Sequence, residues 1–214
     1  MGTDISNIRK NYKLSSISKK NVDPNPLLQL EKWMNEAINK KVLEPTAMII
    51  ATVGKDLKPS TRTVLLKGIS DTQLVFYTNY LSRKGRQLEE NAQISGTLLW
   101  KELERQVHIE GKVEKASSKV SDEYFQSRPR ASKIGARISP QSQVIKSRTK
   151  IKVWFAREAL KVGFGEVQRP ENWGGYYIFP ERMEFWQGRP NRLHDRILYS
   201  RQDDQSWTID RLAP

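Results

Sequence analysis

Three short stretches decide the fold class: TAMIIATVG at residues 46–54, TVLLKGI at 63–69 and LVFYTNY at 74–80. Each is rich in β-branched and aromatic residues, and the polar segments GKDLKPS and SDTQ, which form turns readily, separate them. The pattern predicts antiparallel strands joined by short turns.

The same pattern continues toward the C-terminus. ISGTLLW at 94–100 and RQVHIEGKVEKA at 105–116 complete a predicted meander of about five strands. A second group of strands is predicted at YYIF (176–179), RMEFWQG (182–188), RILYSR (196–201) and SWTIDRL (206–212).

A few helices are predicted around these strands. Asn25 and Pro26 suit an N-cap and a first helical position, so a helix is expected from there to about Lys41. Its apolar stripe, expected in the core, consists of Leu27, Leu30, Met34, Ala37 and Ile38. Further helical patterns cover 82–92, 118–128 and 141–161. Many short strands with few helices predict a mainly β fold with peripheral helices (α+β), arranged as an antiparallel barrel or sandwich.

The composition fits one domain without a metal. The chain has 214 residues, a net charge of +13, no cysteine and two histidines. Residues 1–22 are polar and basic and are expected to form a mobile arm, and residues 23–214 a single domain. The lack of cysteine excludes disulfides, thiolate catalysis and cysteine-bound metals, and two histidines far apart in sequence are too few for a histidine-rich metal site.

The positive charge favours an anionic partner, which could be nucleic acid, acidic lipid or a small phosphorylated ligand. Outside Arg9 to Lys20 the basic residues occur in small groups, which favours pockets over a continuous stripe. No apolar run approaches the roughly 18 residues needed to span a bilayer, and the first ten residues lack the apolar core of a signal peptide. A cytoplasmic location without membrane contact is therefore expected.

The segment SRKGRQLEE, starting at Ser82, indicates a phosphate site. Ser82 suits an N-cap, and Arg83 and Lys84 would then lie in the first helical turn, where cations oppose the helix dipole unless an anion binds the free N–H groups. The alternative is a solvated basic turn.

Two cations bracket the apolar strand TRTVLLKG. Alternation puts Arg62, Val64 and Leu66 on one face and Thr63, Leu65 and Lys67 on the other. Arg62 and Lys67 could reach one ligand only through a turn or a bulge, and the residues alone favour two solvated charges at the strand ends.

The segment RLHDR is the most informative. If it is extended, Arg192, His194 and Arg196 project from one face, where they repel one another unless negative charge lies among them. The alternative is a surface strand in which Asp195 pairs locally. Trp186, shortly before, could stack on a ligand or pack in the core.

A second phosphate site is suggested near residue 128. Tyr124 and Arg128 are four residues apart on a predicted helix and share a face, and Ser132 joins them only if Pro129 introduces a suitable turn. A phenol, a guanidinium and a hydroxyl together suit a phosphate. No hydrolase, P-loop or zinc-protease motif is present. Because the chain has neither thiols nor a credible metal site, redox chemistry would need an organic cofactor.

From about Asp23 to Pro214 the sequence closely resembles the pyridoxine/pyridoxamine 5′-phosphate oxidases. The motifs that carry the resemblance are RTVLLK (62–67), FYTN (76–79), SRK (82–84), ERQVHIEG (104–111), YFQSRPR (124–130), SKIGA (132–136), QS (141–142), WGG (173–175) and FWQGRPNRLHDR (185–196). Arg137-Ile138 and residues 143–172 depart from the family pattern.

The resemblance implies an FMN-binding split β-barrel that forms a homodimer, with FMN in clefts between the subunits. The implied FMN-binding residues are Arg62, Thr63, Val64, Leu65, Leu66, Lys67, Tyr77, Thr78, Ser82, Arg83, Lys84, Gln106, Gln141, Ser142, Trp186 and Arg196. Those implied for the substrate are Arg9, Tyr12, Lys67, Tyr124, Arg128, Ser132, Arg192, Leu193 and His194, of which Arg192 and His194 are the catalytic candidates.

The activity that the resemblance implies is oxidation of pyridoxamine or pyridoxine 5′-phosphate to pyridoxal 5′-phosphate, with dioxygen reduced to hydrogen peroxide. Two alternatives remain at this level. A split-barrel carrier of flavin or vitamin B6 phosphate would bind without oxidising, and a basic nucleic-acid-binding module would be colourless and bind with a steep salt dependence.

Overall fold

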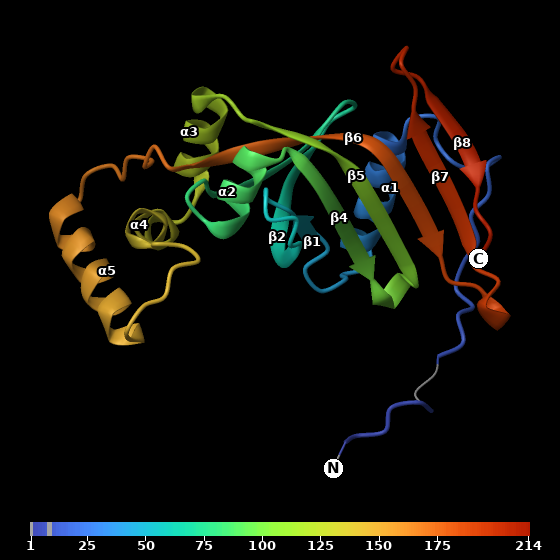
Figure 1. Cartoon of the computed structure of the whole chain (residues 1–214), viewed down its shortest axis with the longest axis horizontal. Coiled ribbons are helices and arrows are strands. Elements are labelled where there is room, and N and C mark those ends of the chain that lie inside the picture. Colours follow the sequence, from blue (N-terminus) through green and yellow to red (C-terminus); the bar gives the residue numbers. More distant parts are fainter. Residues whose placement is uncertain (1, 8–9) are drawn as a thin grey trace.

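The computed structural model describes residues 2–7 and 10–214, and its centre is a six-stranded antiparallel barrel (Figure 1). The strand order is β3-β2-β1-β4-β5-β6, and pairing of β3 with β6 closes it. The barrel strands are β1 (Ala47–Thr52), β2 (Ser60–Ile69), β3 (Leu74–Asn79), β4 (Gln93–Trp100), β5 (Arg105–Lys115) and β6 (Trp173–Gln187). This confirms the mainly β fold with peripheral helices.

The first five strands were expected as a meander, and that connectivity is wrong. β4 pairs with β1 instead of with β3, so the chain crosses over through the short helix α2 (Arg83–Glu90) between β3 and β4. Strand composition and turn signals reveal the strands but carry no information about which partner each strand takes.

Two strands predicted at 176–179 and 182–188 are one continuous strand, β6. Its first half pairs with β3 and its second half with β7 (Asp195–Arg201), which in turn pairs with β8 (Trp207–Arg211). Pro180 is tolerated because the pairing with β5 is irregular there, between Glu110 and Gly111. β6 therefore joins the barrel to the β7–β8 hairpin.

The core fills the barrel and the face under helix α1 (Pro26–Asn39). Side chains alternate along the strands, so Met48 and Ile50 are fully buried while Ile49 between them is 46% exposed. Asn25 caps α1 by accepting the N–H of Leu27 at 2.8 Å, as predicted. The predicted stripe is buried except for Ile38, which is 49% exposed, because α1 turns that residue away from the barrel at its last turn.

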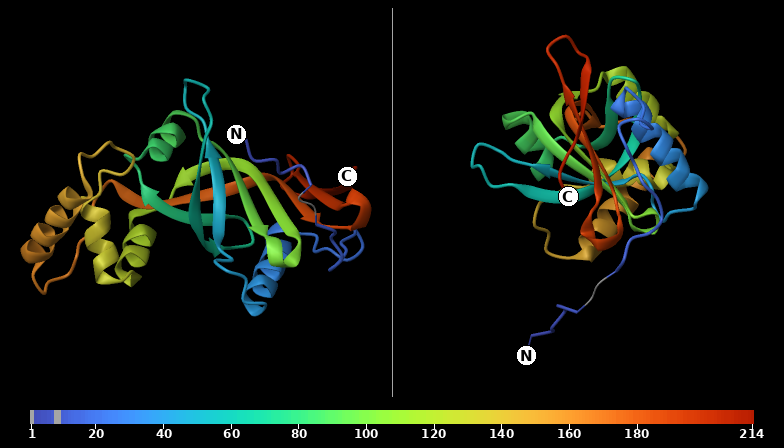
Figure 2. Two further views of the ribbon diagram at one scale, coloured as in Figure 1. Left: turned by 90° about the horizontal axis from the view of Figure 1, so that it is seen from below. Right: turned by 90° about the vertical axis from the view of Figure 1, so that its right-hand side faces the viewer.

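Three helices stand at one end of the molecule (Figures 1 and 2): α3 (Ser118–Ser127), α4 (Arg130–Ile138) and α5 (Arg148–Val162). The helix predicted at 118–128 is confirmed, and Pro129 ends it. The helix predicted at 141–161 begins only at Arg148, because Ser142 has a left-handed φ of 71° and Ser147 caps the N-terminus. Helix α4 was not predicted.

The first 22 residues were expected to be a mobile arm, and mobility stays a prediction. In the structure the part after Arg9 runs along the barrel on the side opposite to α5 (Figures 1 and 2), and Ile17 is only 4% exposed. Within the described residues, every helix is too short or too polar to cross a membrane.

Candidate functional site

Lys84 is a buried cation at the start of α2. Its Nζ donates to Thr78 Oγ1 at 3.0 Å and to Gln141 Oε1 at 2.9 Å. Burial, reinforced by the charge of Arg62, lowers the pKa of Lys84 to about 8. Both partners are neutral, so the side chain is arranged for an anion that the protein itself does not provide.

The first turn of α2 is pressed against the end of β3. Ser82 is the N-cap, as predicted, and its Oγ accepts the N–H of Gly85 at 3.2 Å. A Cβ on Gly85 would lie 2.1 Å from the carbonyl oxygen of Tyr80, so only glycine allows this approach. The close contact directs Lys84 inward, whereas Arg83 is exposed on the outer side of the turn.

Arg62 lies on β2 beside this turn. Its guanidinium donates to Thr52 Oγ1 at 2.6 Å and to the carbonyl oxygen of Ser60 at 2.8 Å. Burial and the charge of Arg83 lower its pKa. The predicted alternation of β2 is confirmed: Thr63, Leu65 and Lys67 are exposed, and the side chains of Val64 and Leu66 face the core, so only their main chains are available to a ligand.

Arg128 is a second cation that forms no ion pair within the described part of the chain. Its guanidinium lies 4.7 Å from the ring centre of Trp173, and burial lowers its pKa. Its Nη1 is buried and has no hydrogen-bond partner among the described residues. Tyr124 stacks on Tyr77 with ring centres 3.8 Å apart, so an aromatic wall stands beside the guanidinium.

One cavity of about 260 Å³, hereafter the helix-side cavity, is lined by Lys84, Arg128 and Tyr124. None of its cations takes part in an ion pair within residues 2–7 and 10–214. Ser132 and Ser142 are exposed outside the cavity, and Leu66 and Arg62 do not line it. The lining residues are Thr63, Val64, Leu65, Lys67, Tyr77, Thr78, Lys84, Tyr124, Arg128, Gln141 and Trp173.

A second cavity of about 980 Å³, the arm-side cavity, lies where the N-terminal arm meets the turn before β7. His194 Nδ1 accepts the backbone N–H of Arg189 at 3.1 Å, so neutral His194 carries its proton on Nε2. Burial and then the charge of Arg192 lower the pKa of His194. The lining residues are Lys10, Asn11, Tyr12, Arg189, Asn191, Arg192 and His194.

RLHDR does not form one extended strand, which was the condition for Arg192, His194 and Arg196 to project from one face. Arg192 has a left-handed φ of 61° and ends the 3-10 helix η2 (Pro190–Arg192), and β7 begins only at Asp195. Arg192 and His194 therefore face the arm-side cavity, while Arg196 does not. Asp195 pairs locally, 2.7 Å from Arg211, as the alternative interpretation held. Leu193 is 66% exposed and lines neither cavity.

Arg196 belongs to a third cavity, of about 440 Å³, on the outer face of the sheet: the sheet-face cavity. It forms a bidentate ion pair with Glu184, at 2.7 and 2.9 Å, which raises its pKa. Trp186 is half-buried at the wall instead of packing in the core. The lining residues are Ser95, Gln106, His108, Glu110, Arg182, Glu184, Trp186, Arg196 and Pro214.

The residues expected to form one site are thus distributed over separate cavities. The helix-side and sheet-face cavities share no lining residue, and neither do the helix-side and arm-side cavities.

Arg9 lies outside the described residues. Sequence reasoning gave no role to Trp173 or Glu184. The first stands in the quoted WGG motif, and the second pairs with Arg196 only through the register of β6 and β7.

Comparison with known proteins identifies the family. Residues 34–161 match the family model for "Pyridoxamine 5'-phosphate oxidase", and residues 173–214 match "Pyridoxine 5'-phosphate oxidase C-terminal dimerisation region". A pyridoxine/pyridoxamine 5′-phosphate oxidase of Bacteroides thetaiotaomicron is 54% identical over 211 residues, covering 99% of both chains. The enzyme of that name from Mannheimia succiniciproducens is 52% identical over 211 residues, with the same coverage of both chains.

Solved structures agree with this result. PhzG from Burkholderia lata 383, crystallised with tetrahydrophenazine-1-carboxylic acid, is 31% identical and has a TM-score of 0.85, covering 91% of this chain and 95% of that one. An FMN-binding protein related to pyridoxamine 5′-phosphate oxidase from Nostoc punctiforme shares the fold, with a TM-score of 0.71 at 19% identity, covering 88% of this chain and 97% of that one. Together, the family models and the full-length relatives show that the chain belongs to the pyridoxine/pyridoxamine 5′-phosphate oxidase family.

Proposed function

We propose that the protein oxidises pyridoxamine 5′-phosphate to pyridoxal 5′-phosphate, with dioxygen as the oxidant, which is reduced to hydrogen peroxide, and with water, which releases the nitrogen as ammonia. Pyridoxine 5′-phosphate and dioxygen give the same aldehyde and hydrogen peroxide. Relatives named for this activity cover the whole chain at about 50% identity. The observation that carries the proposal is a pair of cations that lack counterions among the described residues: Lys84, which is buried, and Arg128, which is half-buried with a buried Nη1. They suit the phosphates of a cofactor and a substrate.

The residues around Lys84 fit the phosphate of FMN. Lys84 and Thr78 present an ammonium and a hydroxyl into the helix-side cavity, and Arg62 stands behind them. When bound, FMN supplies the acceptor for the hydride that leaves the substrate and passes the electrons to dioxygen. The sequence-implied residues Gln106, Trp186 and Arg196 would complete its site.

The remaining groups suit the substrate. Arg128, Lys67 and Tyr124 can hold its phosphate with charge-assisted hydrogen bonds. His194 accepts at Nδ1 and so offers an Nε2–H donor to the pyridine, and Arg192 adds a cation beside it. These two groups would orient the substrate and stabilise the negative charge that develops when it loses a proton.

We further propose that each site combines two subunits of a homodimer, with FMN at the interface. Across the sheet Thr63 pairs with Ile49, Ile49 with Thr97, and Thr97 with His108. Three strand spacings, roughly 14 Å, thus separate Thr63 of the helix-side cavity from His108 of the sheet-face cavity along one chain. The arm-side cavity lies farther off, because η2 and α3 stand on opposite sides of the barrel (Figures 1 and 2).

An exposed apolar face supports this arrangement. Ile49, Leu65 and Leu99 on β1, β2 and β4 are 46%, 41% and 47% exposed and point away from the core. Leu65 lines the helix-side cavity, Leu99 pairs with Gln106 of the sheet-face cavity, and Ile49 lies on the strand between β2 and β4. A second copy packed on this face would cover them and bring the helix-side cavity of one subunit against the sheet-face cavity of the other.

Purified protein is expected to be yellow and to release FMN on denaturation. With pyridoxamine 5′-phosphate it should form hydrogen peroxide and pyridoxal 5′-phosphate in equal amounts over many turnovers, measured by a coupled peroxide assay and by aldehyde absorbance. Bound flavin without peroxide would favour the carrier, and a colourless protein that binds DNA would favour the nucleic-acid module.

Affinity for FMN is expected to fall with rising pH above 8. The pKa of Lys84 is about 8 in the free protein, so below that pH the ammonium is present and the phosphate contact is intact. Between pH 8 and 9 the charged fraction of Lys84 falls, and the dissociation constant should rise by up to about fivefold. Quenching of flavin fluorescence on binding measures the dissociation constant at each pH. Lys84→Gln should bind more weakly with no rise over this window, and a flat profile in the native protein would contradict the assignment.

A further inference from the structure

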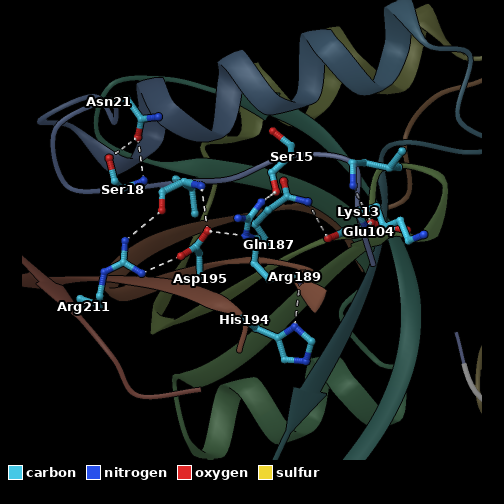
Figure 3. A network of polar contacts seen from close by, with 12 residues as sticks. Lys13, Ser15, Ser18, Asn21, Glu104, Gln187, Arg189, His194, Asp195 and Arg211 are labelled. Atoms are coloured by element: carbon cyan, nitrogen blue, oxygen red, sulfur yellow. Dashed lines mark hydrogen bonds and ion pairs between the residues drawn. The ribbon is translucent and has the colours of Figure 1, made fainter. Parts of the chain in front are cut away.

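Two attachments of different kind hold the N-terminal arm on the barrel, and between them Arg189 Nη1 donates a hydrogen bond to the carbonyl oxygen of Ser15 at 3.0 Å (Figure 3). At Ile17 the attachment is apolar: the side chain is 4% exposed and belongs to the main core. Asp195 and Arg211 hold the same residue through its N–H at 3.3 Å and its carbonyl oxygen at 3.1 Å. Releasing Ile17 would expose the core, so this point is a fixed anchor.

The other point is a single carboxylate, Glu104, between η1 (Lys101–Leu103) and β5. One oxygen, Oε2, accepts the N–H groups of Lys13 at 2.8 Å and Leu14 at 3.1 Å, and the other lies 3.3 Å from Lys10 Nζ. The Glu104 side chain is 3% exposed. Burial alone would raise its pKa, but these hydrogen bonds outweigh it and lower the pKa. Glu104 is thus an ionised, buried group satisfied by the arm.

The backbone of Glu104 is also fixed. It has a left-handed φ of 56°, and its carbonyl oxygen accepts the N–H of Gly188 at 2.8 Å and Nε2 of Gln187 at 3.2 Å. The backbone of Glu104 is therefore held by contacts that do not involve the arm, whereas the partners of its carboxylate are on the arm.

The arm held in this way presents Tyr12 to the arm-side cavity. The Tyr12 ring lies 5.5 Å from Trp186 and 5.7 Å from His194, edge-on to both. A Cβ on Gly188 would lie 2.6 Å from Tyr12 Cγ, so glycine at 188 admits the ring. The Glu104 contacts, Tyr12 and His194 therefore belong to one contact network.

We propose that Glu104 is a positioning residue that latches the arm over the substrate. With Ile17 as a hinge, breaking the two hydrogen bonds to Glu104 frees residues 10–14 and removes Tyr12 from the cavity wall, and remaking them encloses the substrate beside His194. This inference rests on the proposed function for the role of the cavity, but not for the latch itself.

Glu104 binds main-chain N–H groups of the arm, so two substitutions at one arm residue can be compared, one that removes an N–H group and one that keeps it. Lys13→Pro removes one N–H donor, whereas Lys13→Ala keeps it and changes only the exposed side chain. Both substitutions lie on the arm, outside the barrel, so folding of the barrel is not at stake. Glu104→Ala removes the acceptor from the other side, Glu104→Gln keeps one acceptor oxygen, and Glu102→Ala is a control on the exposed face of η1.

Two readouts on the FMN-loaded enzyme test the proposal. In Glu104→Ala and Lys13→Pro, hydrogen exchange of the arm peptide should accelerate by on the order of tenfold or more, and KM for pyridoxamine 5′-phosphate should rise by a similar factor. FMN content and exchange in the barrel strands should not change. Glu104→Gln should recover part of both effects, and Lys13→Ala and Glu102→Ala should resemble the native enzyme.

Unchanged exchange in the arm, or equal effects of Lys13→Pro and Lys13→Ala, would overturn the latch. Faster exchange with an unaltered KM would overturn its role in holding substrate. A native protein that oxidises neither substrate would instead refute the proposed function, and arm exchange would still report on the latch.

Discussion

Replacing Arg192 by alanine is expected to lower kcat by about 100-fold or more while FMN stays bound. Arg192 lines the arm-side cavity next to His194, away from the buried cations assigned to FMN. Its left-handed backbone, at φ 61°, is uncommon for a residue with a long side chain. This conformation directs the guanidinium into the cavity. Steady-state kinetics and flavin absorbance separate the two effects.

The Arg192→Ala variant should also change the pH dependence of kcat/KM. The charge of Arg192 helps to lower the pKa of His194, so its removal should raise that pKa toward the ordinary histidine value. The acidic limb of kcat/KM that reports His194 should move to higher pH. Arg192→Lys should keep the acidic limb near its native position, and Leu193→Ala, at an exposed neighbour, should keep native turnover. Native turnover in Arg192→Ala would remove this residue from the site.

Replacing Leu99 by glutamate is expected to yield a monomer that has lost FMN and nearly all activity. Leu99 is 47% exposed on the outer face of β4, directly opposite Gln106 on β5. A carboxylate buried there in a subunit interface has no partner, which costs several kcal/mol. Under the proposal that each FMN site combines both subunits, cofactor and activity should disappear with the dimer.

Size-exclusion chromatography with light scattering and the flavin spectrum measure both consequences. Leu43→Glu is the control, because Leu43 is 84% exposed before β1 and should tolerate the charge. A dimeric Leu99→Glu protein with a full complement of FMN would place the interface elsewhere.

Local patterns in the sequence predicted the local structure well. Ser82 and Asn25 cap the helices expected of them, and β2 alternates as its residues indicated. These features depend on neighbouring residues alone. The pairing of β4 with β1 and the continuity of β6 through Pro180 depend on contacts between distant segments, so no local pattern could reveal them.

The site was predictable residue by residue but not as an arrangement. Lys84 and Arg128 are 44 positions apart, and the fold brings them to one cavity with Trp173. Arg192 and Arg196 are neighbours in sequence, yet the turn at Arg192 sends them to different cavities. Glu104 begins the quoted ERQVHIEG motif, but its partners could not be predicted, because they are main-chain N–H groups of the arm.

Activity of a mixed dimer tests most directly whether each site combines two subunits. Arg128→Ala impairs the helix-side cavity and Arg192→Ala the arm-side cavity. A mixed dimer contains one Arg128→Ala subunit and one Arg192→Ala subunit and can be isolated through two different tags. If each site combines two subunits, this dimer should contain one native site and one site that carries both substitutions. About half of the native activity per dimer is therefore predicted. Activity no higher than the mean of the two parent variants would show that both cavities serve the same site from one chain and would contradict the account.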